Sequence, residues 1–345
     1  MNSRTKRSAL LSSLTSANAT RRLISIGLLL IMAVIFSATT DAFLSFRNLM
    51  NMLKDSAYLG IFAVGMSFVI VGGGIDLSVG GIACVVGVLS VRLSVLGVPG
   101  ILIVLLGIIM GAFFGGINGI LITRAKLTEF VTTLATGFIF TGLTLVFAFR
   151  ERGSITTVEI PRSSDFRAFG GNLNGVHYIT IAWVILTIIT VLILLKTKFG
   201  LHTYAIGSNP KSAMMSGVNN DKVKMIGYLI CGGCAGLAVV LQASLTGSSP
   251  LNVGSGYEFR AIAACVVGGV ILGGGKGDTF GAFVGSMFLI MLVNGLYKYG
   301  LPFYWDTILQ GVIIIVATTF DAIFNRITSK RLFARALTTG GDLHE

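Results

Sequence analysis

Apolar runs of about 20 residues recur along the chain from Leu23 to Phe324, separated by short polar or glycine-rich stretches. A run of this length spans a bilayer as an α-helix, whereas barrel strands are about ten residues long and alternate in polarity. The pattern predicts an all-α polytopic membrane protein with about ten transmembrane helices, several short enough to be tilted or broken. The predicted spans are residues 23–38, 57–71, 75–93, 101–122, 130–149, 178–195, 225–245, 259–272, 279–296 and 304–324.

Composition supports this prediction, because 54% of the residues are hydrophobic and 12% are charged, about half the charged fraction of a soluble domain. The net charge of +12 does not point to nucleic acid, since the basic residues gather in a few loops without an aromatic-basic module. Counting those loops as cytoplasmic places both termini inside the cell. The inside loops then hold Arg124, Lys126, Lys196, Lys198, Lys211, Lys222, Lys224 and Lys276.

Two glycine-rich segments interrupt the apolar runs. The first, GGGIDLSVGG at 72–81, contains Asp76, the only carboxylate in its apolar region, and glycine weakens a helix by roughly 1 kcal/mol per residue. The second, GGVILGGGKGD, covers 268–278. We interpret both as helix breaks inside the membrane, with tight cytoplasmic turns whose charges face water as the alternative. In either case Asp76 can cap the following helix. The predicted hinge glycines are Gly72, Gly73, Gly74, Gly80, Gly274, Gly275 and Gly277.

Two short motifs occur twice and in the same order. ACVVG stands at 83–87 and 264–268, and GAFFG at 111–115 is echoed by GAFVG at 281–285. The members of each pair lie five predicted spans apart, and an odd separation reverses their direction across the membrane. The repeats therefore predict a 5+5 inverted repeat with broken helices, which is typical of alternating-access transporters.

The longest predicted cytoplasmic loop, 196–225, contains the signals of a short helix. Asn209 suits the N-cap, Pro210 suits the first helical position and Gly217 suits the stop. A short capped helix in a basic loop between two long spans is typical of a docking element for a cytosolic partner. An ordinary amphipathic connector is the alternative.

Motifs for enzymatic chemistry are missing from the sequence. The segment GGGKGD at 273–278 lacks the first glycine of a phosphate-binding loop and the Ser or Thr that follows its lysine. Cys84, Cys231, Cys234 and Cys265 all lie in apolar runs, and we interpret them as packing residues rather than as a redox or zinc motif. Because the spans hold no catalytic triad, metal cluster or carboxylate pair, we predict neither a cofactor nor an enzymatic activity for this chain.

Three long motifs in the chain resemble the membrane permeases of bacterial ATP-binding-cassette importers for monosaccharides of the ribose, xylose, galactose and arabinose type. AVGMSFVIVGGGIDLSVGG (63–81) is similar to the signature around the second and third spans of that family, and KTKFGLHTYAIGSNPKSAMMSGV (196–218) to its coupling loop. GYEFRAIAACVVGGVILGGGKGDTFGAFVGS (256–286) resembles its C-terminal signature. One departure is Arg260, where the family usually has an acidic or small residue.

The resemblance implies a permease domain at 23–325, with cytoplasmic tails at 1–22 and 326–345, in the bacterial inner membrane. It implies a second permease chain, identical or related, a cytosolic ATPase that carries ATP and Mg²⁺, and a periplasmic sugar-binding protein. The implied ATPase-coupling residues are Ala205, Ile206, Gly207, Asn209, Pro210 and Gly217. As polar groups inside predicted spans, Asp76, Ser78 and Asn294 are the candidates for the substrate route.

Other substrates and another transporter class stay open at this point. Related permeases of the same superfamily import nucleosides, branched-chain amino acids or a furanosyl signalling molecule. An ion-coupled secondary carrier would need intramembrane acids or histidines, and only Asp76 qualifies.

Overall fold

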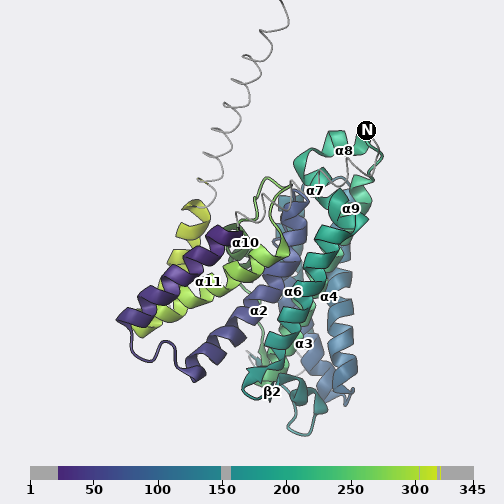
Figure 1. The fold of residues 1–345 in the computed structure, drawn as a ribbon. Helices are drawn as coiled ribbons and strands as arrows, with labels where there is room; N and C mark the ends of the chain where they lie inside the picture. Colours follow the sequence, from purple (N-terminus) through teal and green to yellow (C-terminus); the bar gives the residue numbers. More distant parts are fainter. Residues whose placement is uncertain (1–21, 149–156, 303, 317–318, 320–345) are drawn as a thin grey trace, which may run out of the picture.

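The computed structural model describes residues 22–148, 157–302, 304–316 and 319, and this part of the chain is helical with two small antiparallel β-ladders (Figure 1). Among the described residues, seven helices are long and apolar enough to cross a membrane. They are Arg22–Thr39, α2 (Phe46–Val71), α4 (Gly100–Thr123), α5 (Glu129–Ala148), α6 (Tyr178–Lys196), α9 (Asn220–Thr246) and α11 (Thr279–Lys298). Shorter helices are α3 (Val79–Val95), α10 (Tyr257–Val267) and Tyr304–Val316.

Each predicted span coincides with one of these helices, so the all-α prediction is confirmed. The span predicted at 304–324 is described as a helix as far as Val316. The predicted tails lie outside the described residues, except for Arg22.

The start of α2 is the largest error in the predicted boundaries, since the helix begins at Phe46 rather than at residue 57. Ser45 is its N-cap, and the Ser45 hydroxyl accepts a hydrogen bond from the Asn48 amide (3.4 Å). Lys54 and Asp55 stand just before the predicted span and marked its start in the sequence. In the structure their charged groups lie 3.5 Å apart, and α2 continues through both residues. A polar pair inside a helix ends the hydrophobic signal without ending the helix.

Short elements connect the long helices at the two ends of the molecule. At one end lie α7 (Lys198–Ser208) and α8 (Pro210–Met215), and β2 lies at the other (Figure 1). Besides α7 and α8, the short connecting elements are β1 (Thr157–Glu159), η1 (Asp165–Gly170), β2 (Asn172–Leu173), β3 (Val176–His177) and β4 (Ser248–Pro250). β1 pairs with β4, with Val158 opposite Ser249, and β2 pairs with β3, with Leu173 opposite Val176.

Glycines bring helix backbones together where the repeated motifs lie. In GAFFG of α4, Gly115 packs on Gly232 of α9, and a Cβ added to Gly232 would lie only 2.9 Å from Gly115 Cα. In GAFVG of α11, Gly281 packs on Gly268 at the end of α10, where an added Cβ would lie 3.1 Å from the carbonyl carbon of Gly268. These contacts explain why the sequence repeats glycine at these positions. The CGGC segment contributes Gly232 to this packing, and all four cysteines are buried thiols.

The helix α2 runs through the centre of the bundle. Every residue from Ala57 to Val71 is buried, with Gly60 packed against the Trp183 ring of α6 and Gly65 against Cys234 of α9. The helix Arg22–Thr39 and α4, α5 and α6 instead expose many large apolar side chains. Such surfaces suit contact with lipid hydrocarbon.

Candidate functional site

The short helix predicted in the loop at 196–225 is present as α8, with the predicted caps. The Asn209 Oδ1 atom accepts a hydrogen bond from the Ser212 amide (3.0 Å), and Pro210 occupies the first turn. After the helix, Gly217 has a left-handed φ of +82°, and its amide donates to the Met214 carbonyl (3.0 Å). These are local interactions of the kind that sequence spacing predicts.

The helix α8 has one attached face and one free face. Ala213 lies in a buried cluster with Ile206 of α7 and Val223 of α9. On the other side, Met214 is 63% exposed and Met215 is 87% exposed. Sequence reasoning missed these two methionines, although adjacent apolar residues in a basic loop are a usable signal.

The residues predicted for ATPase coupling divide between these faces. Asn209, Pro210 and Gly217 are exposed around α8, whereas Ile206 and Gly207 are buried beneath it. Ala205 is partly buried. The set therefore contains residues that can meet a partner and residues that fix α8 to the rest of the chain.

Beneath α8, three glycine-containing segments meet at their backbones. We call this contact the glycine junction, and it consists of Gly72, Gly73, Gly74, Gly207, Gly274 and Gly275. The Gly275 amide donates to the Val71 carbonyl at the end of α2 (2.8 Å). A Cβ on Gly274 would lie 2.7 Å from Gly73 Cα, and a Cβ on Gly207 would overlap the Val71 carbonyl oxygen. Gly73, Gly274 and Gly275 have φ values of +83°, +80° and +73°, which favour glycine.

The two segments predicted to be helix breaks thus touch each other and the end of α7. The predicted hinge residues outside the junction are Gly80, in the first turn of α3, and Gly277, which packs on Val270 with φ +99°.

The segment 72–78 is not helical. It runs from the end of α2 into the interior, toward α4 and α5. The Asn118 side chain of α4 donates to Ser78 Oγ (2.6 Å) and accepts from Thr136 Oγ1 of α5 (2.6 Å). Asn118 lies five residues before the end of α4, and Thr136 lies seven residues after the start of α5. At 1.5 Å per residue, Ser78 therefore sits roughly 8–10 Å inside the ends of both helices.

Asp76 is completely buried in the segment 72–78. Its Oδ1 atom accepts hydrogen bonds from the Ser78 amide (2.9 Å) and the Ser78 hydroxyl (2.6 Å). The N-cap of α3 is Ser78 rather than Asp76, so the predicted capping role is wrong in its detail: Asp76 closes the turn that precedes the helix. The alternative interpretation, in which the Asp76 charge faces water, is also wrong.

The second glycine-rich segment divides its two charges. Lys276 is exposed, whereas Asp278 is 2% exposed and caps α11 by accepting from the Gly281 amide (2.9 Å). Its other carboxylate oxygen accepts from Arg22 Nε (2.8 Å). Arg22 at the start of the first described helix is thereby joined to the segment that reaches the glycine junction.

A second non-helical segment, 251–256, leads into the short helix α10. Gly254 packs on Gly80, and a Cβ on Gly80 would lie 2.6 Å from the Gly254 carbonyl oxygen and would overlap the Glu258 carboxylate. Tyr58 in the middle of α2 donates to the Val253 carbonyl (3.2 Å). The first turns of α3 and α10 therefore lie against each other. The chain enters α3 from the α8 end of the molecule. It enters α10 from the opposite end, which we call the β4 end, because α9 runs from beside α8 to Thr246, directly before β4. Sequence reasoning missed this segment, although Pro250, Asn252 and three glycines nearby are turn signals.

Asn294 does not join Asp76 and Ser78. Its amide exchanges two hydrogen bonds of 3.1 Å with the Asn48 amide, and this pair links α11 to the beginning of α2. Arg260 also has a partner within the chain, because its guanidinium pairs with the Asp306 carboxylate in the helix Tyr304–Val316. The structure thus unites two of the three candidate route residues and places the third in a separate contact.

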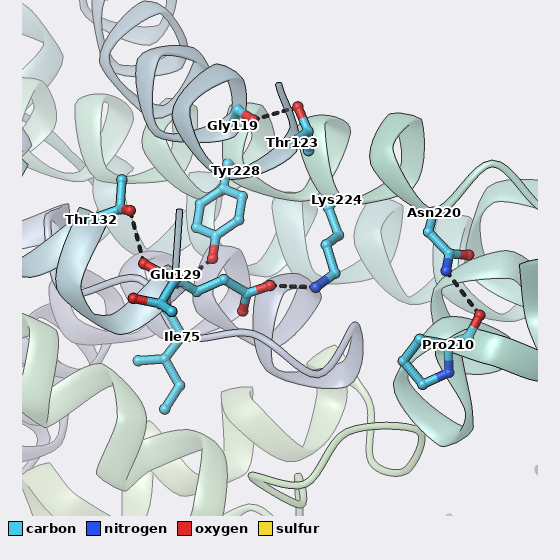
Figure 2. A network of polar contacts seen from close by, with 10 residues as sticks. Ile75, Gly119, Thr123, Glu129, Thr132, Pro210, Asn220, Lys224 and Tyr228 are labelled. Atoms are coloured by element: carbon cyan, nitrogen blue, oxygen red, sulfur yellow. Dashed lines mark hydrogen bonds and ion pairs between the residues drawn. The ribbon is translucent and has the colours of Figure 1, made fainter. Parts of the chain in front are cut away.

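One face of α9 carries polar side chains that reach three different elements (Figure 2). Asn220 donates to the Pro210 carbonyl of α8 (2.9 Å), and Tyr228 donates to the Ile75 carbonyl (3.2 Å). Between them, Lys224 pairs with the Glu129 carboxylate at the start of α5. Glu129, Lys224 and Tyr228 line a small cleft beside Gly72 and Gly74. Within the described residues, no cluster of three metal-ligating side chains occurs here or elsewhere.

Comparison with known proteins identifies the family. Residues 48–318 match the family described as the branched-chain amino acid transport system permease component. The chain belongs to this permease family.

The permease is also similar to individual transport proteins over most of its length. It is 38% identical to the ribose import permease protein of Bacillus subtilis (strain 168) over 294 residues, which cover 85% of this chain and 90% of that one. It is 31% identical to the D-allose transport system permease protein of Escherichia coli (strain K12) over 301 residues, or 87% and 90% of the two chains. It is 29% identical to the xylose transport system permease protein of Haemophilus influenzae over 366 residues, or 89% and 97%. No solved structure matches the permease. The resemblance expected from the three motifs is confirmed.

Proposed function

We propose that this permease is the membrane subunit of an ATP-binding-cassette importer that carries a monosaccharide across the bacterial inner membrane. The observation that carries the proposal is the similarity over most of the chain to permeases named for ribose, D-allose and xylose. The chain is not itself an enzyme, and ATP with Mg²⁺ would be bound by a separate ATPase subunit. A periplasmic binding protein would deliver the sugar.

In this proposal the ATPase docks on α8. The exposed Met214 and Met215 supply a flexible apolar contact, and the buried Ile206 and Gly207 hold the helix on the glycine junction. Basic residues of the loops that flank α7 and α8 favour a cytoplasmic position for this end, with both termini on the same side. The β4 end then faces the periplasm and the binding protein.

We further propose that α3 and α10 are corresponding half-helices of a 5+5 inverted repeat. Support comes from the ACVVG motif that each helix carries and from their first turns, which meet although their leading segments come from opposite ends. The GAFFG and GAFVG helices α4 and α11 follow them in the same order. A pair of this kind suits alternating access, with a second permease chain, identical or related, completing the route. Asp76, Ser78 and Asn294 stay predictions for residues along that route.

Two alternatives would change the substrate or the energy source. The family description names branched-chain amino acids. Nucleosides and a furanosyl signalling molecule are the other alternative substrates that the sequence left open. An ion-coupled carrier would dispense with the ATPase. The names of the similar proteins favour a sugar over these.

Reconstitution tests the proposal. The permease in liposomes with its ATPase and binding protein should take up radiolabelled ribose, allose or xylose only when ATP is present on the ATPase side. Uptake driven by a proton or sodium gradient without the ATPase would refute the proposal. ATP-dependent uptake of leucine or a nucleoside in place of sugar would instead support one of the alternative substrates.

A point substitution tests the docking site. Met215→Glu places a charge on the exposed tip of α8 and should release the ATPase during affinity purification while the permease stays folded in the membrane. Leu173→Glu is the matched control, because Leu173 is 59% exposed on β2 at the opposite end of the molecule. Equal ATPase recovery with both variants would contradict docking on α8.

A further inference from the structure

We propose that Lys224 and Tyr228 are positioning residues that tie the movement of α8 to the buried segment around Asp76. This inference rests on the proposed function, because it assumes that an ATPase moves α8. With Asn220 they form a row along α9, which we call the α9 polar row (Asn220, Lys224 and Tyr228).

The spacing of the α9 polar row places its members on one face of the helix. They stand four residues apart, so their side chains lie above one another over roughly 12 Å of helix. Each contacts a different element: Asn220 reaches α8, Lys224 reaches α5, and Tyr228 reaches the segment 72–78 (Figure 2). A displacement of α8 that pulls on Asn220 therefore acts on a rigid helix whose next two polar contacts lead inward.

The middle contact joins three elements at once. The Glu129 and Lys224 side chains are only 18% and 28% exposed, so their attraction is screened less than that of a surface pair. The Glu129 carboxylate also lies against the junction, since a Cβ on Gly74 would overlap it. If α9 shifts relative to α5, this ion pair and the backbone at Gly74 must move with it.

The inner contact ends beside Asp76. Tyr228 is 1% exposed, and its hydroxyl donates to the Ile75 carbonyl, the residue immediately before Asp76. From Asp76, the hydrogen bonds through Ser78 and Asn118 continue to α4 and α5. The α9 polar row thus connects the exposed docking helix to the place where α3 begins.

A simple packing role would not require charge or a hydroxyl at these positions, and the chain offers a matched comparison. Lys126 pairs with Asp221 at 2.7 Å, and this pair also joins the first turn of α9 to the loop before α5. The Lys126 and Asp221 side chains are 67% and 54% exposed, so this pair lies at the surface, outside the hydrogen bonds that lead to the segment 72–78. Loss of this surface pair should leave transport unchanged.

The test measures sugar uptake and ATP hydrolysis in the same proteoliposomes, which contain the full complex. For Lys224→Met, we expect hydrolysis within about twofold of wild type and uptake per ATP reduced about tenfold, because a partly buried charged contact is lost. Tyr228→Phe keeps the ring and removes one neutral hydrogen bond, so we expect a reduction of about threefold. The exchange Lys224→Glu with Glu129→Lys should recover most of the uptake per ATP, and Lys126→Met should match wild type.

The outcomes separate the two proposals. Unchanged uptake per ATP in both Lys224→Met and Tyr228→Phe would overturn the inference while leaving the importer intact. A parallel fall in uptake and hydrolysis, with no recovery in the exchange variant, would also overturn it, because a purely structural role predicts that result. Failure of the wild-type complex to take up sugar with ATP would instead refute the proposed function.

Discussion

Replacing Gly207 by alanine tests whether the glycine junction is a true backbone contact. Gly207 lies in α7, where its dihedral angles suit alanine, so the substitution adds a methyl group without backbone strain. That methyl would overlap the Val71 carbonyl oxygen, which accepts the 2.8 Å hydrogen bond from Gly275. Losing this buried bond costs about 1–3 kcal/mol, and displacing packed backbone costs about 1–3 kcal/mol more. Alanine regains up to about 1 kcal/mol of helix propensity, so the net loss should be about 1–5 kcal/mol.

The free energy of unfolding of the purified permease in detergent micelles, from a denaturant titration, measures this loss. Gly142→Ala is the control, because Gly142 lies in α5 with no atom within 4 Å of an added Cβ. The control should be unchanged or up to about 1 kcal/mol more stable. If Gly207→Ala behaved like Gly142→Ala, the three segments would not meet as closely as described, and the argument for the junction would fail.

Further predictions concern the buried polar contacts and the cysteines. Asn118→Leu removes two side-chain hydrogen bonds between α3, α4 and α5 and should lower the free energy of unfolding by about 1–3 kcal/mol; an unchanged denaturation midpoint would contradict the described network. Arg260→Ala leaves the Asp306 carboxylate, 10% exposed, without its cation and should cost about 1–3 kcal/mol, of which adding Asp306→Asn should restore part; equal stability of the single and double variants would argue against the pair. A maleimide should label the folded permease at none of its four cysteines and should label all four after denaturation; rapid labelling of the native protein would place at least one at the surface.

Sequence alone predicted the features that depend on neighbouring residues. The long apolar runs located the spans, and Asn209, Pro210 and Gly217 located α8, because caps and first-turn preferences act within a few residues. The early start of α2 escaped prediction for the converse reason, since Lys54 and Asp55 resemble a loop when read as isolated charges.

The spacing of residues along the sequence could not predict contacts between distant segments. The sequence singled out Gly73, Gly207 and Gly274 separately, but their meeting depends on how α2, α7 and the segment before α11 pack. Asn294 illustrates the same limit. A polar residue in a span predicts a polar partner, yet only the fold determines that the partner is Asn48 rather than Asp76.

The glycine junction also restricts how the gene for this permease can change. Any amino-acid replacement of a glycine adds at least one carbon atom, and at Gly207 or Gly274 that atom has no room. No amino acid is smaller than glycine, so evolution cannot replace these glycines by way of a smaller residue. A larger residue would fit only if the other two segments shifted together. We expect the substitutions that change the transported solute to accumulate elsewhere in the chain. The glycine junction should change only through coordinated substitutions in its three segments.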